Sequence, residues 1–236
     1  MSQESAVIVG VGPGLGWSLV RRFAQAGLRV AAAARNRATL DELLRRHAAE
    51  LPPGSVTAYA CDATRPAEVQ ALFEAVGEAP SVVIYNAGTF EPAGILDITP
   101  EQLERCWRIG CLGGFLVGQA AARRMLPRGT GTIIYTGATA ALRGSAGFAN
   151  LAVPKFGLRA LAQSMARELG PRGIHVAHVV IDGQIASERY RQLAEQRGPD
   201  ALLAPDAIAE TYYQLHRQPR SAWTLELDLR PWVEKF

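Results

Sequence analysis

The glycines near the N-terminus are the first residues whose spacing indicates a chemistry. In the run SAVIVGVGPGLG, Gly10, Gly14 and Gly16 stand between an apolar stretch and a segment with helical periodicity. Glycines at a strand-to-helix turn let a diphosphate approach the backbone, where the helix N-terminus offers N–H groups and the positive end of its dipole. We therefore predict a dinucleotide site in which Gly12 and Leu15 also take part. The alternative is a glycine-rich turn that only connects the two elements.

Arg35 indicates which dinucleotide would bind. It follows the second apolar run of the chain, and no Asp or Glu occurs between Gly16 and Asp41. Folds that select NAD place a carboxylate here to bind the ribose 2′-hydroxyl, whereas an arginine suits the 2′-phosphate of NADP. The sequence thus favours NADP(H) over NAD(H). The alternative is that Arg35 merely begins a solvated helix.

The elements that must position these residues follow an α/β pattern. Short apolar runs predict strands, and segments with apolar residues at i, i+3 and i+4 predict helices between them. The predicted strands are 5–11, 28–34, 56–61, 81–86, 131–137, 174–181 and 223–229, and the helices include 17–27, 39–51, 101–125 and 150–169. This alternation predicts a single doubly wound Rossmann domain over 1–236, with a mostly parallel sheet of about seven strands and helices on both faces. Within it, 182–204 is a possible substrate lid and 219–236 a C-terminal strand and tail.

Composition restricts the class of protein. The chain has 236 residues, a formal net charge of +3 and 48% hydrophobic residues, which is typical of a globular domain. No apolar stretch is long enough to span a membrane and no signal peptide is evident, so we expect a cytoplasmic protein. Basic residues alternate with acidic ones, so no nucleic-acid surface is expected. The three cysteines lack metal-binding or redox spacing, and we predict no metal site.

Together these features resemble the short-chain dehydrogenase/reductase superfamily, classical type, over nearly the whole chain. The resemblance rests on the glycine turn, an Asp after the third strand, the sequence Asn-Ala-Gly that ends the fourth strand, and a lysine late in the chain. At 182–187, DGQIAS replaces the usual Pro-Gly segment that holds the nicotinamide carboxamide. The residues expected to contact the cofactor are Gly10, Gly12, Gly14, Leu15, Gly16, Arg35, Asp62, Ala63, Asn86, Ala87, Gly88, Lys155, Gly183 and Ile185.

The catalytic positions depart from the pattern of that family. Its members use a Tyr to protonate the carbonyl oxygen, a Lys that lowers the Tyr pKa and binds the nicotinamide ribose, a Ser that polarises the carbonyl, and an Asn. Here Leu151 stands at the Tyr position, Ala138 at the Ser position and Gly110 at the Asn position, and only Lys155 is kept. The chain is thus similar to an atypical subgroup that lacks the Tyr and the Ser. Loss of a general acid alone typically costs about 10²–10⁴ in rate.

Other residues could supply the missing proton. Thr136 and Thr139 border the Ser position, whereas Tyr135 lies inside a strand and is expected to fill the core. For Tyr190, in the possible lid, we expect a surface role, with reach into the cleft as the alternative. For Asp182 we expect a role in forming the turn before a glycine, with a role as an acid beside the nicotinamide as the alternative.

The sequence leaves three functions open. The first is an NADP(H)-dependent oxidoreductase that acts on a small carbonyl or alcohol with an incomplete catalytic set. The second is an inactive protein that binds the dinucleotide as a structural or sensory ligand, and the third is a non-redox enzyme, such as a cyclase or isomerase, on the same fold.

The resemblance also implies a homodimer or homotetramer. Relatives pair the helices that correspond to 101–125 and 150–169, and Phe148, Phe156 and Leu161 are predicted to belong to the core or to this interface.

Overall fold

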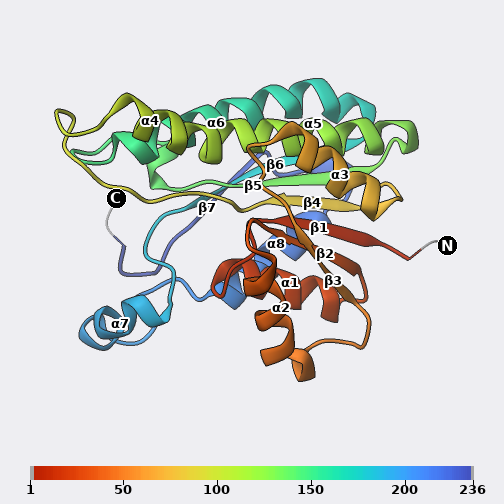
Figure 1. Cartoon of the computed structure of the whole chain (residues 1–236), viewed down its shortest axis with the longest axis horizontal. Helices are drawn as coiled ribbons and strands as arrows, with labels where there is room; N and C mark the ends of the chain where they lie inside the picture. Colours follow the sequence, from red (N-terminus) through yellow and green to blue (C-terminus); the bar gives the residue numbers. More distant parts are fainter. Residues whose placement is uncertain (1–2, 235–236) are drawn as a thin grey trace.

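A parallel sheet of seven strands forms the centre of the molecule (Figure 1). The computed structural model describes residues 3–234. The strands are β1 (Ser5–Val9), β2 (Arg29–Ala34), β3 (Val56–Ala60), β4 (Val82–Tyr85), β5 (Gly131–Thr136), β6 (Ile174–Ile181) and β7 (Glu226–Leu229). They lie in the order β3-β2-β1-β4-β5-β6-β7, and every neighbouring pair is parallel. The predicted single Rossmann domain with seven strands is therefore confirmed.

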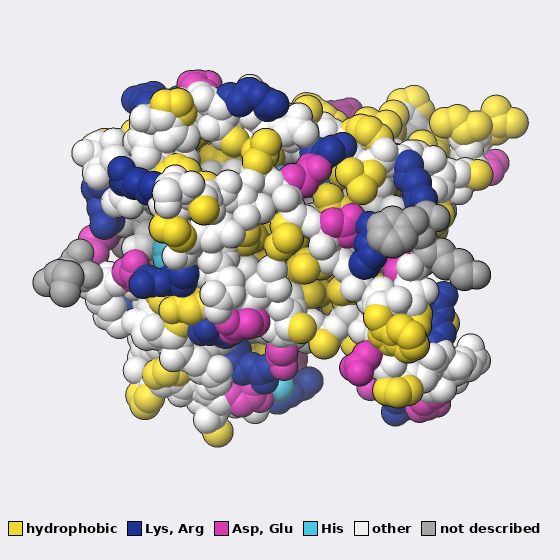
Figure 2. Space-filling view, turned by 180° about the vertical axis from the view of Figure 1, so that it is seen from behind, with side chains coloured by type: hydrophobic (Ala, Val, Ile, Leu, Met, Phe, Trp, Pro, Cys, Tyr) yellow, Lys and Arg dark blue, Asp and Glu magenta, His cyan; other side chains and the backbone are white. Residues whose placement is uncertain are grey.

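The helices cover both faces of this sheet. They are α1 (Leu15–Gln25), α2 (Arg37–Arg46), α3 (Pro66–Val76), α4 (Pro100–Trp107), α5 (Gly113–Met125), α6 (Ala149–Leu169), α7 (Arg191–Arg197) and α8 (Pro205–His216). Figure 1 shows α1, α2 and α8 on one face and α3 to α6 on the other. Helix α7 belongs to a separate lobe, which a cleft divides from the main body at the lower right of Figure 2.

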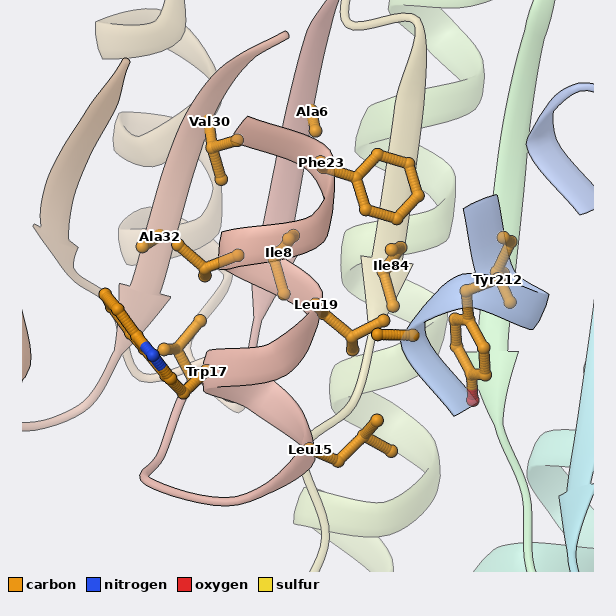
Figure 3. Close-up of a cluster of buried hydrophobic side chains, with 14 of the residues drawn as sticks. Ala6, Ile8, Leu15, Trp17, Leu19, Phe23, Val30, Ala32, Ile84 and Tyr212 are labelled. Carbon is orange, nitrogen blue, oxygen red and sulfur yellow. The ribbon is translucent and has the colours of Figure 1, made fainter. Parts of the chain in front are cut away.

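Two apolar cores result, one on each face of the sheet. In the first, Leu19 and Phe23 of α1 and Tyr212 of α8 pack on Ile8 of β1 (Figure 3). In the second, side chains of α3, α5 and α6 pack on the opposite face. Strands β1, β4 and β6 are buried along their whole length, which explains why their sequences are mostly apolar and do not alternate between apolar and polar residues.

The helix predicted over 101–125 is divided in two. Helix α4 begins as its sequence predicts, with Thr99 and Gln102 forming a capping box. A π-helical turn over Arg108–Leu112 then separates α4 from α5. Within this wider turn the carbonyl of Ile109 accepts a hydrogen bond of 2.5 Å from the hydroxyl of Tyr85 on β4. The turn thus ties the helix to the sheet, a contact that the periodicity of the sequence does not reveal.

In residues 3–234, none of the helices combines the length and the apolar character that crossing a membrane requires. The same residues contain no group of three or more His, Cys, Asp or Glu side chains placed to hold a metal ion.

Candidate functional site

The carboxyl ends of β1, β2 and β4 surround a cavity of about 310 Å³, here called the first cavity. Strands β2 and β4 flank β1 and continue the chain in opposite directions across the sheet, so the cavity lies at the switch point where open α/β sheets bind ligands. Many of the residues predicted to contact a cofactor line it, namely Gly10, Gly12, Arg35, Asp62, Ala63, Asn86, Ala87 and Gly88.

The glycines of the turn divide into two pairs. Gly10 has a φ of +94°, and a Cβ there would lie 2.4 Å from the backbone nitrogen of Ala87. A Cβ on Gly16 would lie 2.8 Å from another backbone atom of the same turn. Gly12 and Gly14 are different, because neither has a positive φ and a Cβ on either would meet nothing within 4 Å. Packing therefore requires glycine at positions 10 and 16, whereas the space over Gly12 and Gly14 is open to a ligand.

Helix α1 starts directly after this turn. Gly14 is its N-cap, and no side chain of the described residues caps it. No acidic residue lies in its first turn, so the positive end of the helix dipole is uncompensated. Gly14 and Leu15 line a second cavity, of about 450 Å³. An anionic group would be stabilised where this helix begins.

Arg35 lies at the rim of the first cavity with Asn36 and Thr39. Its side chain is exposed, and it forms no ion pair with another described residue. The carboxylate of Asp62, in the same cavity, accepts hydrogen bonds from the Thr64 backbone at 3.0 Å and from the Thr64 hydroxyl at 2.8 Å. Burial alone would raise the pKa of Asp62, but these bonds and the charges of Arg65 and Arg35 outweigh it and lower that pKa. One guanidinium is thus available at the edge, beside an ionised carboxylate.

A series of buried hydrogen bonds fixes the floor of the first cavity. The side-chain amide of Asn86 donates to the carbonyl of Gly10 at 3.1 Å. The hydroxyl of Thr136 donates to the amide oxygen of Asn86 at 3.0 Å, and the hydroxyl of Tyr212 donates to that of Thr136 at 2.9 Å. The glycine turn is therefore held in register with β4, β5 and α8.

Lys155 lies directly behind this floor. Its side chain is 6% exposed, and its Nζ donates to the carbonyl of Thr136 at 2.6 Å. Burial lowers the pKa of Lys155 from 10.5 to about 8. The amino group would be 3.7 Å from a Cβ on Gly88, although Lys155 itself lines neither the first nor the second cavity. Lys155 is thus a buried residue next to the cavity and not an ordinary surface residue.

A third cavity, of about 420 Å³, adjoins the second. The two share six lining residues, namely Ala138, Ile181, Gly183, Gln184, Arg189 and Tyr190. Leu151 of α6 also lines the third cavity. Leu151 and Ala138 thus line the same cavity. Both side chains are apolar, so neither can donate a proton or a hydrogen bond to a bound molecule. Ile185 lines the second cavity, whereas Gly16 lies beneath the turn and outside these cavities.

Gly110, at the expected Asn position, lines none of these cavities. It is buried in the π-helical turn, where a Cβ would lie 2.6 Å from Cβ of Pro154 on α6. An asparagine could not occupy this position without displacing α6.

The expectation of a surface role for Tyr190 is wrong. Tyr190 is half-buried and lines both the second and the third cavity. The reason lies in the segment 182–204, which closes on itself because Leu203 pairs with Ile185 in a short parallel bridge. Ala186 donates to the carbonyl of Leu203 at 2.8 Å, and Leu203 donates to that of Gln184 at 2.9 Å. This closure directs the intervening turn toward the cavities.

Burial and contacts bear on three other expectations. Tyr135 fills the core, as predicted. Phe148 is half-buried, lines the third cavity and packs against Phe90 with ring centroids 5.6 Å apart, so it is not a core residue, and its place at an interface stays a prediction. Asp182 accepts a hydrogen bond from the hydroxyl of Thr139 and forms an ion pair of 3.3 Å with Arg230. Both carboxylate oxygens of Asp182 thus have partners within the protein.

Several lining residues escape prediction from the sequence. Asn36, Thr39, Thr64 and Ile109 line the first cavity, and Phe90, Arg143, Ser145 and Arg197 line the third. Position directly after a parallel strand could have indicated Asn36 and Thr64. Nothing in the sequence predicts that Arg197 lines a cavity, because its position depends on how the lobe that carries α7 packs beside the sheet.

Comparisons with known proteins agree with this geometry. The sequence profile described as short chain dehydrogenase matches residues 4–198. A 3-oxoacyl-[acyl-carrier-protein] reductase, MabA, of Mycobacterium avium is 31% identical over 202 residues, which cover 84% of this chain and 74% of that protein. A crystal structure of a short-chain dehydrogenase from Rhodopseudomonas palustris has a TM-score of 0.83 and 38% identity, covering 98% of this chain and 100% of that one. A metagenomic short-chain oxidoreductase in complex with NADP has a TM-score of 0.82 and 25% identity, with 98% of each chain covered.

Proposed function

The chain belongs to the short-chain dehydrogenase family, and on that premise we propose that it binds NADP(H) and transfers hydride to or from a small carbonyl compound or alcohol in the third cavity. The nicotinamide end would lie in the second cavity, which shares a wall with the third.

The observation that carries this proposal is the open space over Gly12 and Gly14. No packing contact requires glycine at either position, and the close approach of a diphosphate favours glycine at both. Gly14 has a second reason, because its backbone (φ −95°, ψ −127°) lies outside the regions usual for other residues. The two glycines line the first and the second cavity respectively, at the uncapped start of α1. A dinucleotide that extends across this turn would therefore occupy both cavities.

Three residues in or next to the first cavity would then have separate tasks. Arg35 would bind the 2′-phosphate, because a guanidinium matches the geometry of phosphate oxygens. Asp62 would accept from the adenine amino group, and Lys155 would donate to the nicotinamide ribose. When bound, NADPH supplies the hydride.

The proton for the substrate oxygen needs a source other than Leu151. Tyr190 carries a hydroxyl, lines both the second and the third cavity, and lies on the segment 182–204. We assign the proton to Tyr190. The segment itself would act as a lid over the bound substrate.

A second candidate function is favoured by the apolar pair Leu151 and Ala138. A protein that binds the dinucleotide without reducing anything needs no donor on that wall. Turnover of NADPH with a panel of aldehydes and ketones separates the two functions. Turnover above the level of a Tyr190→Phe variant supports the oxidoreductase, and nucleotide binding without any turnover supports the second function.

The proposed cofactor is tested by calorimetric titration of the purified protein with NADPH and NADH. We expect NADPH to bind more tightly, and Arg35→Ala to weaken NADPH binding about tenfold, since a hydrogen bond to a charged group contributes about 1.5–3 kcal/mol and Arg35 is exposed. NADH binding should change little. Arg45→Ala is the matched control, because Arg45 is also exposed and lines no described cavity. Equal binding of both nucleotides before and after the substitution would reject the role of Arg35.

A further inference from the structure

The arginines of this protein differ in whether they have partners. Within residues 3–234 most of them pair with a carboxylate or donate to a backbone carbonyl. The arginines without such a partner among these residues are Arg35, Arg45, Arg123, Arg143, Arg172, Arg189 and Arg197. Those that line cavities are Arg35, in the first cavity, Arg143 and Arg197, in the third, and Arg189, in both the second and the third.

The three arginines of the third cavity come from separate parts of the chain. Arg143 follows β5, Arg189 lies in the short turn before α7, and Arg197 ends α7. Arg189 also lies over the ring of Tyr190, with its guanidinium 5.5 Å from the ring centroid. The closure of the segment 182–204 brings these charges to one cavity.

The acidic side chains of the same cavity do not neutralise these arginines. Asp182 is paired with Arg230 at 3.3 Å and accepts from Thr139. Glu234 interacts electrostatically with Arg230 and raises its pKa, after the larger contribution of Asp228. Both carboxylates are thus grouped around Arg230, and the three arginines keep an excess of positive charge on the rest of the wall.

We propose that the third cavity takes a carbonyl compound that carries an anionic group, a carboxylate or a phosphate, which Arg143, Arg189 and Arg197 bind. Guanidinium groups form paired, charge-assisted hydrogen bonds with both kinds of anion. A volume of about 420 Å³ suits a small molecule. This inference rests on the proposed function for the carbonyl, but the anion site itself does not depend on turnover.

Binding of matched probes tests the inference. The probes are 4-oxopentanoate and its methyl ester, and dihydroxyacetone phosphate and dihydroxyacetone, titrated calorimetrically with and without saturating NADP⁺. We expect an anion to bind about tenfold more tightly than its neutral partner at low salt, because several exposed charge pairs contribute additively. This advantage should shrink as salt rises, because salt screens exposed charges. The two pairs show whether carboxylate or phosphate is preferred.

The variant Arg143→Gln/Arg189→Gln/Arg197→Gln identifies the residues responsible. We expect the anion to lose its advantage to within about twofold, whereas Arg172→Gln, at an exposed arginine away from the cavity, leaves it unchanged. Circular dichroism and NADPH titration check that the variant is folded and that its nucleotide site is intact. The inference would be overturned if the anion and its neutral partner bind equally in both pairs, or if neither binds. It would also be overturned if the anion still binds more tightly than its neutral partner in the triple variant. Failure of NADPH to bind the unaltered protein would instead reject the proposed function.

Discussion

Leu151 and Ala138 stand at the two positions where the family carries its catalytic Tyr and Ser, but neither side chain can donate a proton. Both residues line the third cavity. Leu151 lies four residues before the buried Lys155 on the same helix, and Ala138 lies in the connection between β5 and that helix. This wall of the third cavity lacks the phenol and the hydroxyl of the family's Tyr and Ser, and the Asn position is also changed, to Gly110. The backbone that would carry those groups is already in place, so restoring the side chains is a direct test of what their loss has cost.

The variant Ala138→Ser/Leu151→Tyr is expected to reduce carbonyl compounds faster than the unaltered protein. A positioned general acid contributes about 10²–10⁴ in rate, and because Tyr190 already supplies a proton in the proposed mechanism, we expect a gain in kcat at the lower end of this range, about 10². The measurement is NADPH oxidation with an aldehyde and ketone panel. Ala138→Ser/Leu151→Phe is the control, because it fills the same space without a hydroxyl. Equal rates in both variants, with NADPH binding intact, would show that the wall does not face the reacting carbonyl.

The buried Lys155 makes stability depend on pH. Its pKa is about 8 in the folded protein against an ordinary 10.5, so between these values the unfolded chain binds more protons than the folded one. The free energy of unfolding should therefore rise with pH over this range, by up to about 3 kcal/mol. Urea unfolding without nucleotide, from pH 7 to 10.5, should show this rise in the difference between the unaltered protein and Lys155→Met. A difference that stays flat, or falls, would mean that the lysine is not desolvated.

The packing of α4, α5 and α6 determines which side chain fits at position 110, where the family carries an Asn. Gly110 lies in the π-helical turn and faces Pro154 of α6 at a distance that leaves no room for a side chain. Pro154 is tolerated inside α6 near its start, where little of the helix precedes it. Gly110 and Pro154 thus pack directly against each other. This contact explains why a glycine replaces the family's Asn at position 110, without reference to catalysis.

A double-mutant cycle tests this unit. Gly110→Asn should destabilise the protein by about 1–3 kcal/mol through overpacking. The same substitution in a Pro154→Gly background should cost clearly less, because the colliding Cβ and Cγ atoms of Pro154 are gone. Urea unfolding of the four proteins measures the coupling. The same cost in both backgrounds would show that Pro154 is not what excludes the side chain.

At the scale of the whole molecule, apolar side chains remain exposed on the helices of one face. Trp107, Phe115, Val153 and Phe156 lie on α4, α5 and α6 and are 39%, 40%, 48% and 43% exposed. Figure 2 shows apolar side chains along the upper part of the molecule, where Figure 1 places this helical layer. Such a group on one layer is typical of an interface with another protein surface. We propose that a second copy of this chain covers it, as a homodimer or as half of a homotetramer.

Light scattering after size-exclusion chromatography measures this state. The unaltered protein should have at least twice the chain mass of 25.4 kDa, and Phe115→Asp/Phe156→Asp should shift it toward a single chain, because burying unpaired carboxylates in an interface is costly. Phe115→Leu/Phe156→Leu keeps the surface apolar and should leave the mass unchanged. A single-chain mass for the unaltered protein would reject the proposed assembly.

The amino-acid sequence alone determined the fold class, the strands and the glycine turn. Apolar periodicity and turn glycines act over a few neighbouring residues, so these features can be recognised locally. The tertiary structure decided that Gly10 and Gly16 serve packing whereas Gly12 and Gly14 leave open space. It also decided that Tyr190 faces the cavities and that Arg143 and Arg197 line the same one. These relations depend on contacts between residues far apart in the chain, and such contacts form only when the segment 182–204 closes beside the sheet.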